Sequence, residues 1–278
     1  NDRQTIQKLG KICNEKYCAF TGDDDFLVPN SLTKCAMFLK DNLDYRTAQG
    51  KAIFFSLKSN TPYGEILGLG PYWNKTESIE ETCEKRILSF GSNYWVPQFS
   101  VHRSDEFIED SINYAKVIDK SFGEILHSFT FICKGKSKFI NTLYLFRQGH
   151  EFQYNLPNVL DWIYSSEWNP SFNFFIGSLS SEINKLDFDI NKKPEDIAKK
   201  AFGFYLFNFF EKNNKKKIVN DISLKSQLKK YINKFPRLKK IIKTMIKNND
   251  QLSLTKLKNK SSPYNEDFMP VYKLLTKE

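Results

Sequence analysis

The stretch that decides the fold is Cys18-Ala19-Phe20-Thr21-Gly22-Asp23-Asp24-Asp25-Phe26-Leu27-Val28-Pro29. A short apolar run there ends in three adjacent carboxylates, and a second apolar step and a proline follow. Three like charges in a row repel one another, so a chain tolerates them on a solvated turn or where a cation neutralises them. The apolar flanks favour a place at the end of a buried strand, where ligands bind in α/β sheets. Carboxylate oxygens there suit Mg²⁺ or Mn²⁺, which pair with substrate phosphates.

The segments around the acidic stretch alternate between helix and strand patterns. Apolar residues at helical spacing predict helices over residues 2–14 and 31–42. Strand patterns cover residues 16–20 and 52–55, so the order is helix, strand, acidic turn, helix, strand. This alternation predicts an α/β fold whose strands run parallel.

The remaining chain divides into three parts by its composition. Scattered glycines and aromatic residues predict an inserted loop over 60–91, with residues 60–75 mobile near a site. Further strands and helices complete an α/β domain over residues 1–150; they are expected at 94–101, 105–118, 124–134 and 139–146. Residues 151–211 predict an aromatic helical layer, and residues 212–278 a basic helical tail.

Composition places the chain among globular proteins. Its 278 residues are 40% hydrophobic and 15% aromatic, which is ample for a core. The five cysteines form an odd set without a C-x-x-C pair, which favours reduced thiols in a cytoplasm over disulfides or a zinc site. The sequence contains no apolar run of 18 residues, so we expect no transmembrane helix.

The positive charge is concentrated near the C-terminal end of the sequence. Residues 212–260 hold 16 Lys or Arg and only two acids, Asp221 and Asp250, so this segment carries +14. The whole chain carries +10, which leaves −4 for the remainder. A basic amphipathic helix is expected over 224–247, kinked at Pro236. It suits either packing on the domain by its apolar face or binding to an anionic membrane.

Several segments, taken in order, resemble a known family. They are the acidic stretch Phe20–Pro29, Ala48-Gln49-Gly50, Ser100–Phe107, Phe122-Gly123-Glu124 and Arg147-Gln148-Gly149-His150. Over roughly residues 1–150 this set resembles the middle of a family-2 glycosyltransferase with the GT-A fold. In that family an acidic D-x-D-type cluster ends a strand and holds a divalent cation under the sugar-nucleotide diphosphate.

The resemblance implies a role for each of these residues. Adjacent side chains of an extended segment point to opposite sides, so Asp23 and Asp25 are the expected ligands of a Mn²⁺ or Mg²⁺ ion. Asp24 is then expected to contact the donor sugar or ribose, and Arg147 and His150 to lie on the donor side. His102 and Arg103 are expected to line the acceptor side.

The catalytic base implied by the resemblance is Glu124. Ile125 stands where the family usually has a second acid, so Asp119 and Asp105 are alternatives. Without the family pattern, Glu124 suits the first turn of an ordinary helix, and the three aspartates suit an exposed turn before one.

The function implied is that of a metal-dependent, inverting glycosyltransferase. It would move a sugar from a nucleotide-sugar donor to a glycan or lipid-linked acceptor, in the cytoplasm or at the inner face of a membrane. The family's nucleotide-binding first half does not precede Asn1, so we expect an N-terminally truncated domain. No Q-x-x-R-W element is present, so we do not expect a processive polysaccharide synthase. A protein that binds nucleic acid or membrane through its Lys-rich tail is the alternative, as is a non-catalytic fragment. Nucleic acid is disfavoured because the tail lacks regular aromatic interleaving.

Overall fold

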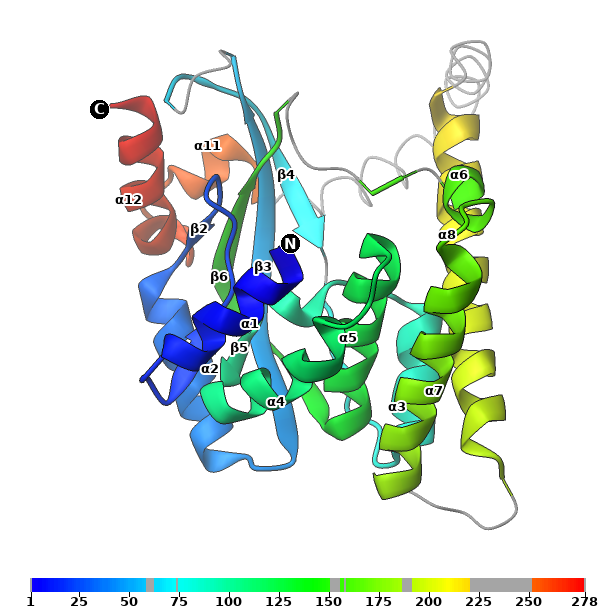
Figure 1. Ribbon diagram of the computed structural model, residues 1–278. Helices are drawn as coiled ribbons and strands as arrows, with labels where there is room; N and C mark the ends of the chain where they lie inside the picture. The colour runs from blue at the N-terminus through cyan, green and yellow to red at the C-terminus, as the bar shows by residue number, and fades with distance from the viewer. Residues whose placement is uncertain are drawn as a thin grey trace, which may run out of the picture.

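The protein is an α/β structure in which helices flank a mixed, curled β-sheet (Figure 1). The computed structural model describes residues 2–58, 63–73, 75–150, 156–157, 159–186, 192–220 and 252–277. The helix expected over 224–247 therefore lies outside the described residues. No helix in these ranges is long and apolar enough to cross a lipid bilayer.

The sheet is built on two long strands, β3 (Tyr45–Leu57) and β6 (Lys136–Gln148), which run parallel to each other. Four shorter strands join them, giving the order β1-β5-β3-β6-β2 with β4 also paired to β3. They are β1 (Tyr17–Ala19), β2 (Phe26–Leu27), β4 (Ile66–Trp73) and β5 (Val101–Arg103).

Our expectation of parallel strands was wrong for most of this sheet. All the described pairings except β3 with β6 are antiparallel. The helices α3, α4 and α5 lie between β3 and β6 in the sequence and supply the crossover that a parallel pair needs. The three-residue and two-residue strands pair antiparallel at the sheet's margins, and period-2 patterns in such short segments carry no information on direction.

A group of helices forms a layer beside the sheet, on the right of Figure 1. Its core is aromatic, and Phe122, Phe175 and Phe202 are almost completely buried in it. The helices of this layer are α3 (Cys83–Ser92), α5 (Lys120–Lys134), α6 (Val159–Ile163), α7 (Trp168–Leu186) and α8 (Pro194–Asn220).

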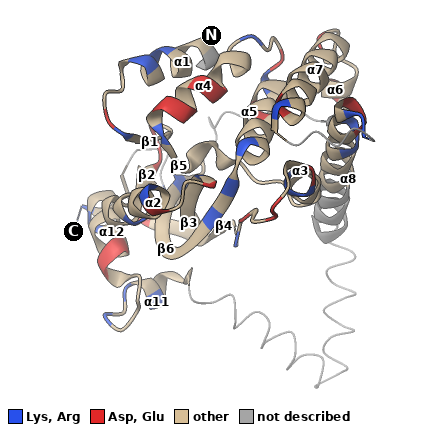
Figure 2. Cartoon of the chain, turned by 90° about the horizontal axis from the view of Figure 1, so that it is seen from below, with Lys and Arg blue, Asp and Glu red and all other residues tan. Residues whose placement is uncertain are grey.

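Residues 252–277, which we expected in a basic helical tail, are helical and pack in the globular core. The helices α11 (Leu254–Leu257) and α12 (Asn265–Thr276) cover the face of β3 and β6 that carries Ile53 and Phe55. The rings of Phe146 and Phe268 lie 5.9 Å apart between them. Figure 2 shows these helices on the opposite side of the sheet from α3 and α8.

The other face of the central strands packs on α2 (Pro29–Asp41). Leu39 and Cys35 of α2 contact the cluster that contains Ala48, Ala52 and Tyr144. The helices α1 (Asp2–Ile12) and α4 (Ser104–Tyr114) lie beside each other near β1 and β5 (Figure 2).

Three local expectations differ from the structure. The segment expected to be a loop contains β4 and α3, because the β4 glycines oppose Phe54 and Ser56 of β3 and do not break the strand. The strand expected over 94–101 is the 3₁₀ turn η1 (Pro97–Phe99) followed by β5. The helix expected from residue 124 begins at Lys120, because the Asp119 Oδ1 atom caps it by accepting from the Phe122 N–H at 2.7 Å.

Two helical glycines form a matched pair for a stability test. A Cβ on Gly91 of α3 would collide with the Ala201 carbonyl oxygen of α8, whereas a Cβ on Gly203 would meet no atom within 4 Å. Gly91→Ala is expected to lower the free energy of unfolding by about 1–3 kcal/mol. Gly203→Ala is expected to raise it by about 0.5–1 kcal/mol, since alanine favours the helix. Urea unfolding measures both, and equal changes would contradict the close approach of α3 and α8.

Candidate functional site

The acidic turn lies at the end of the sheet where β6 finishes. Phe26 of β2 pairs with Phe146 of β6, so the register places Asp25 opposite Arg147. The Asp25 backbone N–H donates to the Gly22 carbonyl at 3.4 Å and closes a tight turn. The short strand β2 thus anchors the aspartates beside the residues that follow β6.

Two of the three carboxylates converge on one small space. If residue 22 carried a Cβ, that atom would stand 2.7 Å from Asp24 Oδ1 and 3.1 Å from Asp25 Oδ2. The other oxygen of each carboxylate has a partner near the end of β6. Asp24 Oδ2 lies 2.8 Å from His150 Nε2. Asp25 Oδ1 accepts from the Gln148 backbone N–H at 3.2 Å. Glycine at position 22 leaves the space between the carboxylates open.

This geometry differs from the alternation that we expected for the three aspartates. The chain bends at Asp23 and Asp24 and is not extended there, so adjacent side chains do not alternate between two sides. Asp23 lies at the exposed corner of the turn. The structure therefore brings Asp24 together with Asp25, where the sequence argument had paired Asp23 with Asp25.

Arg147 is the central cation of the site. Its Cζ atom lies 5.0 Å from the ring centroid of Tyr72 and 4.8 Å from that of Phe99. Burial raises the pKa of both Asp25 and Glu124, and the positive charge of Arg147 opposes that rise at both carboxylates. Arg147 thus links the acidic turn to Glu124 on α5.

Burial raises the pKa of Asp25 above that of an ordinary aspartate. The charge of Arg147 opposes this rise in pKa, and the neighbouring Asp24 carboxylate adds to it. Two carboxylates that share a space in this way are stabilised in their charged form by a cation placed between them.

Glu124 lies one turn into α5 and is partly buried. The Tyr94 hydroxyl donates to Glu124 Oε1 at 3.0 Å. Burial raises the Glu124 pKa above that of an ordinary glutamate, while the Tyr94 hydrogen bond and the Arg147 charge act in the opposite direction. A carboxylate of raised pKa next to a cation and a hydroxyl is typical of a catalytic base.

The two alternative acids are placed differently. Asp119 caps α5 and its Oδ1 atom also accepts from the Trp162 Nε1–H at 3.0 Å, so it has a structural role. Asp105 is exposed in the first turn of α4.

His102 and Arg103 do not join the cluster of Asp24, Asp25 and Arg147. His102 is 1% exposed, packs on the rings of Phe107 and Phe131, and has its pKa lowered to about 3 by burial and by the charge of Arg46. Arg103 pairs with Glu106 at 3.1 Å and donates to the carbonyls of three residues, Leu39, Asn42 and Tyr45. Both side chains hold β5 to its neighbours and lie outside the cluster of Asp24, Asp25 and Arg147.

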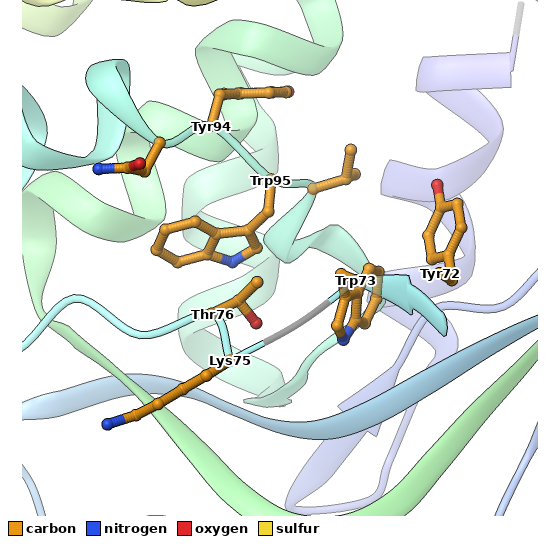
Figure 3. Close-up of a pocket in the computed structure, with 8 residues that line it drawn as sticks. Tyr72, Trp73, Lys75, Thr76, Tyr94 and Trp95 are labelled. Carbon is orange, nitrogen blue, oxygen red and sulfur yellow. The ribbon is translucent and has the colours of Figure 1, made fainter. Parts of the chain in front are cut away.

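An aromatic pocket lies beside Tyr94, which bonds Glu124, and Tyr72, which lies under Arg147. Figure 3 shows this pocket. It has a volume of about 470 Å³ and is lined by Tyr72, Trp73, Lys75, Thr76, Asn93, Tyr94, Trp95 and Val96. The sequence alone did not single out Tyr72 and Tyr94, which contact Arg147 and Glu124 respectively. The signal was present as two Tyr-Trp pairs, Tyr72-Trp73 and Tyr94-Trp95.

The donor set at the acidic turn suits a hard divalent cation that completes its shell with substrate oxygens. Within the described ranges, no group of three or more His, Cys, Asp or Glu side chains converges as a closed metal site. Mg²⁺ is commonly held by one or two carboxylates plus substrate phosphates. The Asp24 and Asp25 oxygens beside Gly22 fit that mode of binding.

The sequence matches no protein-family model, and no curated protein matches it.

Proposed function

We propose that this protein is a metal-dependent, inverting glycosyltransferase that uses a nucleotide-sugar donor, with its sheet as part of a GT-A fold. The observation that carries the proposal is the set of charges around Arg147: the Asp24–Asp25 pair and the partly buried Glu124. The set lies at the carboxyl end of β6, the end of a parallel pair where ligands bind in α/β sheets.

The donor diphosphate is assigned to the acidic turn. Asp24 and Asp25 would hold Mn²⁺ or Mg²⁺, which when bound would stabilise the charge that develops on the pyrophosphate leaving group. Arg147 offers a second positive charge for the same phosphates. His150 holds one oxygen of Asp24 at 2.8 Å and so orients that carboxylate.

The base of the reaction is assigned to Glu124. It would accept the proton of the acceptor hydroxyl as that oxygen attacks the anomeric carbon. A raised pKa suits this task, because a stronger base takes a proton more readily near neutral pH. The Tyr94 hydroxyl fixes the orientation of the carboxylate.

The reaction is assigned to the cytoplasm, where the protein would meet its acceptor. Residues 212–260 would bind the anionic inner face of a membrane. The segment carries +14, and Phe207 on the described part of α8 is 66% exposed. Lysines together with exposed aromatic residues are typical of membrane-surface helices.

Replacing five lysines by glutamine should distinguish binding to a membrane from binding to nucleic acid. The lysines are Lys215, Lys216, Lys217, Lys239 and Lys240. Binding to phosphatidylglycerol vesicles is expected to fall at least tenfold, since each lysine near an anionic surface contributes about 1 kcal/mol. Cosedimentation measures it. Deletion of 212–260 is unsuitable because it removes Leu252 and Leu257 from the core. Loss of DNA binding with unchanged vesicle binding would overturn the membrane assignment.

Metal removal tests the proposed function in the full-length protein. Incubation with UDP-, GDP- and CDP-linked sugars is expected to show consumption of one donor in the presence of Mn²⁺. Chelation by EDTA should abolish donor consumption, and added Mn²⁺ or Mg²⁺ should restore it. The reason is that the negative carboxylate pair needs a bound cation to neutralise the negative diphosphate. Nucleotide release measured by chromatography is the readout. Donor consumption that persists in EDTA would contradict the proposal.

A further inference from the structure

The aromatic pocket beside Glu124 carries an inference that deepens the proposed function and rests on it. Its walls come from two segments that flank α3 in the sequence, the end of β4 with the residues after it and the chain that follows α3. Figure 3 shows Trp95 and Trp73 on these two segments, with Thr76 and Lys75 below the Trp95 ring. Aromatic faces combined with a few polar groups are typical of sites for small ligands.

Trp95 provides a polar atom without a partner in this pocket. The side chain is only 8% exposed, and its Nε1–H is buried and makes no hydrogen bond within the described part of the chain. A buried N–H without a partner costs roughly 1–3 kcal/mol relative to one that is satisfied. By contrast, the indole N–H of Trp73 donates to the Gly50 carbonyl at 2.9 Å, so the Trp73 ring is held by the sheet. The unsatisfied donor of Trp95 therefore points to a ligand with hydrogen-bond acceptors.

The pocket connects to the proposed base through Tyr94. Tyr94 lines the pocket and its hydroxyl donates to Glu124 Oε1. Tyr72 lines the opposite part and stacks under Arg147, 5.0 Å from the guanidinium carbon. A ligand in the pocket would thus contact the hydrogen-bond partner of Glu124 on one wall and the aromatic ring under Arg147 on the other.

We propose that this pocket binds a pyranose ring of a carbohydrate acceptor and delivers one of its hydroxyls to Glu124. The apolar C–H face of the sugar would stack on the indole of Trp73, and the Trp95 Nε1–H would donate to a sugar oxygen. Lys75, Thr76 and Asn93 supply polar groups for further hydroxyls. A volume of about 470 Å³ lies within the range of small-ligand sites. The acceptor is then a glycan, and a sugar and not a lipid chain occupies the site.

Trp95→Phe and Trp73→Ala test this assignment by calorimetric titration of the full-length protein in EDTA. The probes are cellotriose and N,N′,N″-triacetylchitotriose, with sorbitol as the open-chain control. At least one trisaccharide should bind and sorbitol should not. Trp95→Phe keeps the ring and removes only the N–H, so the affinity should fall about five- to tenfold without loss of stability, since that N–H bonds no protein atom. Trp73→Ala should reduce binding at least tenfold, whereas Tyr164→Ala, which removes an aromatic ring that is 84% exposed, should leave it unchanged.

Binding in EDTA separates the acceptor site from the proposed transfer reaction. Metal-dependent donor consumption without binding of either trisaccharide would overturn the pocket assignment and leave the proposed function standing. Trisaccharide binding that is lost in Trp73→Ala, without any donor consumption, would support the pocket and sink the transferase. Displacement of a bound trisaccharide by UDP in EDTA would show that the pocket takes the nucleobase, and would overturn the assignment.

Discussion

Replacing Asp25 by asparagine is expected to lower sugar transfer by about 10³-fold, the scale of losing a group that stabilises developing charge. The substitution keeps the size of the side chain and removes a charge from the pair that converges beside Gly22. Asparagine can still accept from the Gln148 N–H, so the turn should keep its shape. Initial rates at saturating Mn²⁺, together with the Mn²⁺ concentration for half-maximal rate, measure the effect.

The neighbouring aspartates provide the controls. Asp24→Asn should resemble Asp25→Asn, because the two carboxylates face one space. Asp23→Asn should cost less than tenfold, since Asp23 lies at the exposed corner of the turn. Asp41→Asn on the exposed end of α2 should leave the rate unchanged. A larger loss for Asp23 than for Asp24 would show that the cation is held as the extended-chain argument supposed.

Replacing Glu124 by glutamine is expected to lower transfer by about 10²–10⁴-fold, the usual contribution of a positioned base. Binding of the donor diphosphate with Mn²⁺ should not change, because Glu124 lies on α5 and not on the acidic turn. Rates and equilibrium binding of the nucleoside diphosphate measure the two effects separately. Glu266→Gln, at an exposed position on α12, is the matched control. Equal losses of rate and of diphosphate binding would contradict the role of a base.

The raised pKa of Glu124 also predicts a dependence of stability on pH. The folded protein binds the Glu124 proton more tightly than the unfolded chain does, so this group makes stability fall as pH rises through the folded pKa. Glu124→Gln should therefore raise the Tm by a few degrees at neutral pH. The difference should vanish at a pH below the ordinary glutamate value of about 4.3, where both states are protonated. Differential scanning calorimetry at the two pH values tests this independently of activity.

Long periodic segments were predictable from the sequence. The helices at α2 and α5 and the two central strands carry apolar residues on defined faces, so their existence followed from spacing alone. Strand direction was not predictable, because β1 and β2 are short and pair through contacts with β5 and β6 that are distant in sequence. The packing of residues 252–277 on the sheet was not predictable for the same reason. Phe268 contacts Phe146, which is more than a hundred residues away in the sequence.

The candidate site was predictable in its charged residues and not in its aromatic ones. Asp24, Asp25, Arg147 and His150 were named from the sequence and lie together. Their arrangement was missed, because an alternating pattern was assumed where the chain makes a turn. His102 was expected to face the acceptor, yet its neighbours Phe107 and Phe131 enclose the ring. Residue type alone does not distinguish a histidine in a cleft from one in a core.

The packing of α11 and α12 on β3 and β6 has a consequence for how the protein is made. Both strands are synthesised well before residues 252–277, which cover their apolar face. During translation, therefore, Ile53, Phe55 and Phe146 remain without their native cover until that late segment emerges from the ribosome. Such an interval leaves a nascent sheet open to chaperone binding or to aggregation. The order of synthesis makes the covering of this face a late step of folding in the cell.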